Sequence, residues 1–133
     1  ATAEDMALAR ALMGAVGAVV ALDDEAQIDA VTAVSGSGPA YVFHLIEAMA
    51  AAGVAEGLAP DVAMQLARAT VCGAGELAHR SPDTAAQLRV NVTSPGGTTA
   101  AALGVLMDPV AGFPQLLARA VKAAADRGRE LGA

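Results

Sequence analysis

The chain has 133 residues and a net charge of −6, and it is 55% hydrophobic but only 2% aromatic. This length predicts one domain, residues 1–133, with enough chain for a core. An acidic chain without a basic stripe is not expected to bind nucleic acid. Because aromatic anchors are scarce, the chain has more apolar helix surface than one copy can cover, and this favours an oligomer.

Membrane and redox signals are weak. The longest apolar run, Ala11–Leu22, is shorter than the roughly 20 residues that span a bilayer, and no signal-peptide pattern is present. The single cysteine, Cys72, cannot form an internal disulfide, and we expect it to be a small core residue of a helix. These features predict a cytoplasmic protein with no membrane partner.

The first third of the chain predicts two helices and a connection. Thr2 and Asp5 match a capping box, and apolar residues then recur at helical spacing, so a helix is expected over about Ala3–Met13. Val19–Leu22 is expected to form a buried connection. Asp24 resembles the cap of a short second helix. The acidic residues around it are interpreted as helix-start charges, and no metal site is predicted.

Two long helices are predicted next. Pro39 suits the first turn of one, and Pro60 starts another that closes at Arg80. The second is apolar nearly all round, which predicts a central or interface position. His44, on the first, is interpreted as structural. The expected apolar faces are Val42, Leu45, Ile46, Met49 and Gly53 on the first helix, and Val62, Leu66, Ala69, Gly73 and Leu77 on the second.

The C-terminal third predicts three further helices. A strong start signal at residues 81–84 precedes a helix whose Ala85, Leu88 and Val92 are expected to face inward. A second helix follows Thr99 and ends near Met107, and the last runs from about Phe113 to Leu131. Its expected buried stripe is Leu117, Ala120, Val121 and Ala124. The predicted fold class is therefore all-α, with about six to seven helices.

The polar segment with the clearest chemical purpose is Thr93-Ser94-Pro95-Gly96-Gly97-Thr98-Thr99. Pro95 fixes a backbone angle, and the two glycines allow a turn and close approach by another molecule. A glycine turn that opens a helix leaves several N–H groups pointing the same way, which suits a carboxylate or phosphate. The alternative interpretation of this segment alone is an ordinary helix cap.

A second glycine-serine turn, Ser35-Gly36-Ser37-Gly38-Pro39-Ala40-Tyr41, opens the first long helix. With this turn, the sequence resembles the C-terminal domain of pyrroline-5-carboxylate reductase. That family carries S-G-S-G-P-A-Y before a long apolar helix and V-T-S-P-G-G-T-T later, and both strings stand intact here, in order. The family's closing R-S-R-E-L appears as Arg127-Gly128-Arg129-Glu130-Leu131, with glycine in place of the usual serine.

The resemblance covers essentially the whole chain and implies a function. The family reduces the C=N bond of 1-pyrroline-5-carboxylate to L-proline with NADP or NAD, which its N-terminal dinucleotide-binding domain mainly holds. The resemblance also implies a helical bundle that interlocks with a second copy, in a dimer and sometimes in a ring of dimers. Because that N-terminal domain precedes it in the family, the present chain is expected to be a fragment and inactive alone.

The resemblance also implies residue roles. The substrate-binding residues would be Ser94, Gly97, Thr98 and Thr99, and the cofactor-facing residues would be Ser37, Gly38 and Pro39. Thr99 would lie by the ring nitrogen of the imine and would be the catalytic residue. The chain departs from the family pattern at Val90 and Pro114, where charged residues are usual, and both positions lie outside the two motifs.

Three interpretations stay open from the sequence. No serine-histidine-aspartate set, paired catalytic carboxylates, metal cluster or nucleotide loop can be assembled. The chain is therefore either the substrate half of a hydride-transfer enzyme, where orientation of the reactants can suffice, or a structural dimerisation module without activity. Another imine or keto-acid reductase on the same scaffold is a third, weaker candidate.

Overall fold

Helices account for all the regular structure of residues 2–132, the part of the chain that the computed structural model describes. No strand occurs in that range, so the predicted all-α class is confirmed. The α-helices are α1 (Ala3–Gly14), α2 (Ile28–Val31), α3 (Gly38–Ala55), α4 (Pro60–Arg80), α5 (Ala85–Asn91), α6 (Thr98–Leu106) and α7 (Phe113–Gly132). A 3₁₀ turn, η1 (Glu25–Gln27), and a π-helical turn, η2 (Thr32–Gly36), flank α2.

Local signals in the sequence place the helix starts well. Thr2 and Asp5 form the predicted capping box at α1, and Thr84 caps α5 by accepting the N–H of Gln87. Asp24 accepts the N–H of Ala26, although the helix it caps begins as a 3₁₀ turn. These side chains pair N–H groups that would otherwise have no partner.

The α3–α4 hairpin is the best-packed part of the chain, and small residues make its contact. Ala50, Ala63 and Ala67 are buried there, with Ile46 packed against them. A Cβ on Gly53 would lie 3.4 Å from the Ala63 Cβ, so the two backbones approach closely at that point. Side chains of this size allow close helix–helix packing but bury little area each.

The large apolar residues of α4 point the other way, which corrects the prediction for its faces. Val62, Leu66 and Leu77 remain 41%, 51% and 50% exposed, while the alanine flank of the helix is the buried one. The side of α4 that packs is the one whose small residues let α3 approach closely. The bulkier face stays largely exposed among the residues that the structure describes.

Other burial predictions were wrong in whole or in part. The connection through Val19–Leu22 is exposed rather than buried, with Val20 at 80%. Cys72 is exposed. Val92 of the predicted inward set is 63% exposed, whereas Leu88 is half-buried. On α7 the buried residue is Ala125, while Ala120, Val121 and Ala124 of the predicted stripe are half-buried and Leu117 is 45% exposed.

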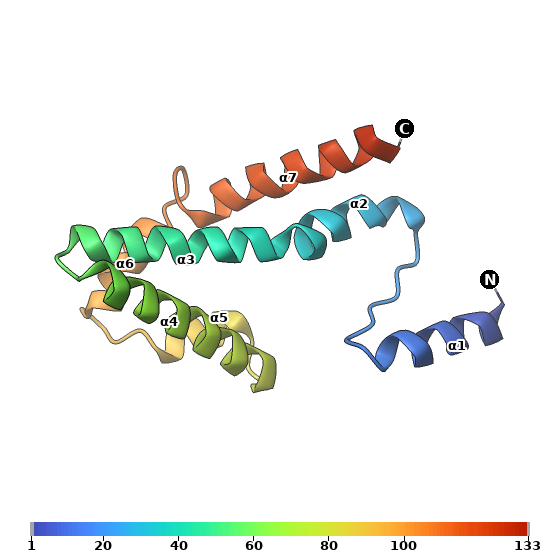
Figure 1. Ribbon diagram of the computed structural model, residues 1–133, viewed down its shortest axis with the longest axis horizontal. Coiled ribbons are helices and arrows are strands. Elements are labelled where there is room, and N and C mark those ends of the chain that lie inside the picture. The colour runs from blue at the N-terminus through green and yellow to red at the C-terminus, as the bar shows by residue number, and fades with distance from the viewer. Residues whose placement is uncertain (1, 133) are drawn as a thin grey trace.

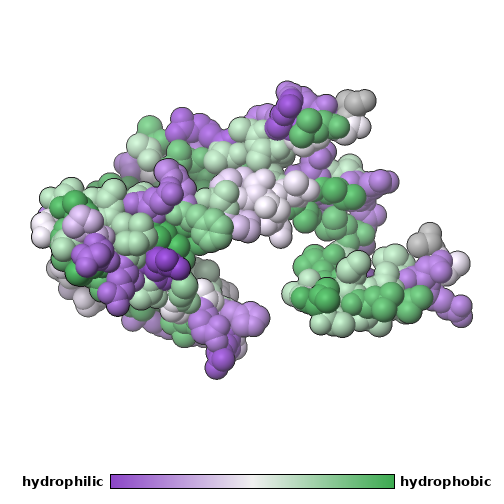
Figure 2. Space-filling model, in the orientation of Figure 1, coloured by the Kyte–Doolittle hydropathy of each residue, from purple (hydrophilic) through white to green (hydrophobic). Residues whose placement is uncertain are grey.

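The first helix stands apart from the rest of the molecule. Figure 1 shows α1 connected to η1 by an extended segment and separated from the other helices, and none of its residues is buried. Its surface in Figure 2 carries a large hydrophobic area. Leu8, Leu12 and Met13 are each more than 60% exposed. This helix therefore presents apolar side chains that no other part of residues 2–132 covers.

The helical stretch Glu25–Ala55 is, by length and composition alone, long and apolar enough to cross a membrane. The length of uninterrupted apolar runs did not predict this stretch, because η1, α2, η2 and α3 join into one helical segment. Core helices of soluble proteins meet the same criterion. The feature therefore does not distinguish a lipid environment from a protein one.

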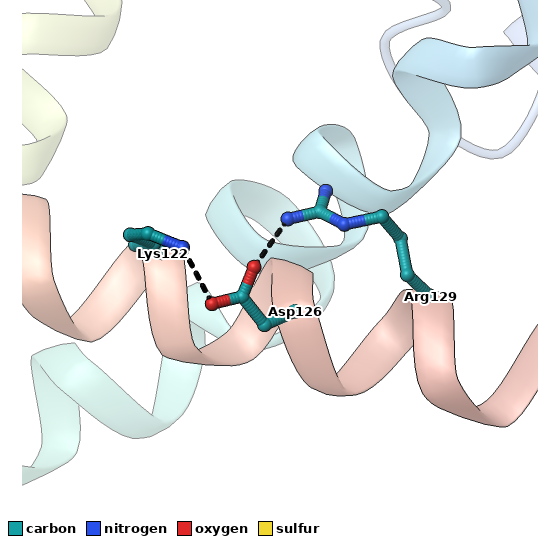
Figure 3. A network of polar contacts seen from close by, with 3 residues as sticks. All are labelled: Lys122, Asp126 and Arg129. Carbon is teal, nitrogen blue, oxygen red and sulfur yellow. Dashed lines mark hydrogen bonds and ion pairs between the residues drawn. The ribbon is translucent and has the colours of Figure 1, made fainter.

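An ion network on α7 gives a testable electrostatic prediction (Figure 3). Lys122 Nζ lies 2.7 Å from Asp126 Oδ2, and Arg129 Nη2 lies 2.5 Å from Oδ1. The hydrogen bond from Lys122, followed by that from Arg129, lowers the pKa of the Asp126 carboxyl below its ordinary value of 3.8. A lowered folded-state pKa stabilises the fold above the unfolded pKa, and this stabilisation is lost as pH falls through the folded value.

We therefore expect Asp126→Asn to lower the melting temperature slightly at neutral pH and to have no effect at a pH below the folded pKa. The effect is small because the carboxylate is exposed and solvent screens it. Thermal melts of both proteins across this pH range test the prediction. A difference that persists unchanged into acid would show that the carboxylate's charge is not the cause.

Candidate functional site

The loop between α5 and α6 is a tight turn that opens directly into a helix. Gly96 adopts a φ of +69°, a conformation that residues with a Cβ rarely take. The Gly97 N–H donates to the Ser94 carbonyl at 3.1 Å. Gly97 is the N-cap of α6, and no side chain caps that helix. The N–H groups of the first turn of α6 therefore have no partner within the helix.

Three hydroxyl groups surround this helix start. Ser94 and Thr98 are exposed and Thr99 is half-buried. A Cβ built on Gly97 would overlap the Ser94 hydroxyl, which shows how closely that side chain folds over the turn. None of the hydrogen bonds within residues 2–132 uses these three hydroxyls, so they are free to bind a ligand. Together, the N–H groups and hydroxyls can bind an anionic group.

The ends of this loop are braced by contacts that the sequence analysis missed. Thr93 Oγ1 donates to the Arg89 carbonyl at 2.6 Å, and the Arg89 guanidinium contacts the Met107 sulfur at 3.1 Å. The first contact closes the end of α5, and the second joins α5 to the end of α6. No spacing rule predicts the second contact, because its two residues are 18 positions apart.

The second motif forms the junction between η2 and α3. Ser37 and Gly38 are half-buried and Pro39 is exposed. A Cβ built on Gly38 would meet nothing within 4 Å, so the surface over this residue is open. Nearby, His44 Nδ1 lies 3.0 Å from Glu47 Oε2 in an exposed pair, which gives this histidine a surface partner.

The two motifs do not meet within one chain. Figure 1 shows the junction of η2 and α3 at the α2 end of α3, whereas the loop before α6 lies towards the opposite end of that long helix. α5 and α6 also make few contacts with the other elements. A site that uses both motifs therefore needs a second copy of the chain or a further domain.

An apolar groove runs between α3 and α7, with a volume of about 700 Å³. The side chains that line it include Val42, Leu45, Phe113, Leu116 and Leu117. His44 and Tyr41 are the lining residues whose side chains carry polar groups. Such a lining suits apolar side chains of another protein segment better than a small charged ligand.

Comparison with known proteins assigns the chain to a family. A family model described as pyrroline-5-carboxylate reductase dimerisation matches residues 25–131. The chain belongs to this family. The match includes the junction of η2 and α3, the loop before α6 and nearly all of α7, and it begins after α1.

Curated pyrroline-5-carboxylate reductases are similar over most of the chain. The protein of Pseudomonas aeruginosa is 50% identical over 120 residues, which are 90% of this chain and 43% of that relative. The protein of Pisum sativum is 49% identical over 131 residues, which are 98% of this chain and 47% of that relative. The chain spans about half the length of the curated relatives it matches.

Solved structures share the fold. A pyrroline-5-carboxylate reductase from Coxiella burnetii has a TM-score of 0.90 at 40% identity, over 98% of this chain and 48% of that one. The Plasmodium falciparum pyrroline carboxylate reductase, solved with NADP bound, has a TM-score of 0.81 at 32% identity, over 100% of this chain and 50% of that one. The open arrangement of helices is therefore similar to that of solved family members.

Proposed function

We propose that residues 1–133 are the helical dimerisation and substrate-binding domain of a pyrroline-5-carboxylate reductase. The complete enzyme would reduce the C=N bond of 1-pyrroline-5-carboxylate to L-proline with NADPH or NADH, in the cytoplasm. The observation that carries this proposal is the intact loop from Thr93 to Thr99, whose hydroxyls and N–H groups are unused at the start of α6. A purely structural module has no need of such a loop.

The substrate carboxylate fits the start of α6. Ser94, Thr98 and the N–H groups that follow Gly97 present hydrogen-bond donors to one place, and the positive end of the helix dipole favours an anion there. Thr99 lies one residue further along the helix. Its hydroxyl can donate a hydrogen bond to the imine nitrogen or accept one from its protonated form. Such a hydrogen bond would stabilise the nitrogen as its charge changes during reduction.

The cofactor would contact this chain through Ser37, Gly38 and Pro39. The open surface over Gly38 and the exposed proline ring fit a flat ring that approaches closely. When bound, the nicotinamide supplies the hydride. This segment would orient the ring and exclude water, while an upstream domain would hold the rest of the cofactor.

A second copy of the chain is the partner that best explains the exposed apolar surface. The chain exposes 10118 Å², whereas a compact monomer of 13.1 kDa exposes roughly 6,400 Å². The excess is roughly 3,700 Å² per chain, or roughly 7,400 Å² for two chains, which is more than the 2,000 to about 5,000 Å² in total that obligate interfaces commonly cover. The five buried hydrophobic residues within residues 2–132 are all alanines, so one chain alone has almost no core. Two copies that interlock through these faces would supply one.

The first experiment compares this chain with a version extended upstream by the dinucleotide-binding half that the family carries. Oxidation of the reduced nicotinamide is followed by absorbance after 1-pyrroline-5-carboxylate is added. We expect activity only in the extended protein. A folded extended protein that oxidises no cofactor would contradict the proposal. It would then favour the structural module, while activity only on other imines or keto acids would reassign the substrate.

A glycine substitution tests the carboxylate site. We expect Gly97→Ala in the complete enzyme to raise the KM for the imine by about tenfold. A change of this size corresponds to the loss of roughly one hydrogen bond to the substrate. The reason is that the new Cβ displaces the Ser94 hydroxyl. Steady-state kinetics measure this change.

Gly104→Ala, within α6, is the matched control. A Cβ at Gly104 meets nothing within 4 Å, so the KM should stay unchanged and stability should rise by about 1 kcal/mol at most. Equal KM values in wild type and Gly97→Ala would remove Ser94 from the substrate site.

A further inference from the structure

The backbone before α3 leaves one carbonyl without its usual donor. In an α-helix the Ser37 N–H would donate to the Ala33 carbonyl, four residues earlier. Here it donates instead to the Thr32 carbonyl at 2.8 Å, because η2 is a π-helical turn. Ala33 is the most buried hydrophobic residue within residues 2–132, at 1% exposure. A buried carbonyl without a partner is costly, so another donor is required.

Tyr41 supplies that donor. Its hydroxyl donates to the Ala33 carbonyl at 2.9 Å, across the junction between η2 and α3. The ring is half-buried and lines the groove between α3 and α7. This is the only tyrosine in the sequence. One side chain therefore bridges the two helical segments on either side of Ser37, Gly38 and Pro39.

η2 packs against α7 and α3, but few hydrogen bonds fix the segment that follows it. Gly36 and Gly38 tolerate many backbone angles, and Pro39 has no N–H to donate. Among residues 36–40, the Ala40 N–H makes a short turn bond with the Ser37 carbonyl at 3.1 Å. π-helical turns of this kind occur often at functional sites, where they re-aim the backbone. The Tyr41 hydroxyl is thus the side-chain donor that joins the start of α3 to η2 across this segment.

We propose that Tyr41 is a positioning residue for hydride transfer, which fixes the segment Ser37–Pro39 against the nicotinamide end of the cofactor. The inference rests on the proposed reductase function and adds to it a residue that touches neither substrate nor cofactor. Without the hydroxyl, the Ala33 carbonyl would regain the Ser37 N–H by relaxing towards an α-helix. That change would shift the register of the following residues.

The test uses the complete enzyme with Tyr41→Phe, which keeps the ring in the groove and removes the hydroxyl. We expect the KM for the nicotinamide cofactor to rise about five- to tenfold, while the KM for the imine stays near wild type. The shift corresponds to the loss of one neutral hydrogen bond that holds the binding-competent geometry. Hydrogen exchange should also become faster at the amides of residues 36–40.

Thr84→Ala is the matched control. It removes a structural hydroxyl that accepts the Gln87 N–H at 3.2 Å, outside both motifs. This variant should lose some thermal stability without any change in cofactor KM. If Tyr41→Phe behaves like Thr84→Ala, or leaves both the cofactor KM and the exchange rates unchanged, the positioning role is overturned. An inactive wild-type enzyme would instead overturn the reductase function, so the two failures can be told apart.

Discussion

Replacing Thr99 by alanine in the complete enzyme is expected to lower kcat by about ten- to a hundredfold. The half-buried hydroxyl of Thr99 belongs to the first turn of α6, and none of the hydrogen bonds within the described residues uses it. A hydrogen bond to a group that becomes charged is worth about 1.5–3 kcal/mol, and each 1.36 kcal/mol is tenfold in rate. Because the bond would strengthen as charge changes at nitrogen, its loss should appear in kcat more than in KM.

Two variants make this prediction specific. Thr99→Ser keeps the hydroxyl and should retain most of the activity. Thr98→Ala removes the neighbouring hydroxyl, which we place at the carboxylate, and should mainly raise the KM for the imine. Steady-state kinetics on the three variants separate these effects. A Thr99→Ala enzyme with wild-type kcat would exclude a role for this hydroxyl at the reacting nitrogen.

Helix positions were predictable from the sequence because their signals are local. The capping box at Thr2 and Asp5, the cap at Thr84 and the proline at the start of α4 each act within one turn. Burial was not predictable in the same way. On α4, hydrophobicity favoured Val62 and Leu66 as core residues, but the alanines at 63 and 67 are buried because they let α3 approach. Periodicity marks an apolar face without saying which molecule covers it.

In the candidate site, too, local features were predictable from the sequence and the contacts between distant segments were not. The glycine turn that opens α6 was predicted with its N–H groups and hydroxyls, since a contiguous string encodes it. The separation of this loop from the segment at Ser37 was not predicted, because it depends on the path of α3 between them. Nor was the contact between Tyr41 and Ala33. A π-helical turn shifts hydrogen-bond partners by one residue, and no residue pattern in the sequence predicts such a turn.

Charge placed in the α3–α7 groove should separate the dimer. Leu117 lines this groove and is 45% exposed in one chain, so a second copy can bury it further. We expect Leu117→Asp to cost about 3 kcal/mol per copy, through lost apolar burial and desolvation of a carboxylate. In a two-fold symmetric dimer the change occurs twice, which weakens association by roughly four orders of magnitude. Sedimentation of the complete enzyme measures the dissociation constant.

The matched control is Gln115→Asp, which adds the same charge to the same helix, two residues away. Gln115 is exposed on the opposite face, and the first turn of α7 favours a negative charge, so the dimer should persist. Leu117→Ala is a milder second variant that introduces no charge, and it should weaken association by about ten- to a hundredfold. Because the motifs at Ser37 and Thr99 lie apart in one chain, loss of activity should follow loss of the dimer at each protein concentration. A folded Leu117→Asp protein that stays dimeric would show that another surface joins the two copies.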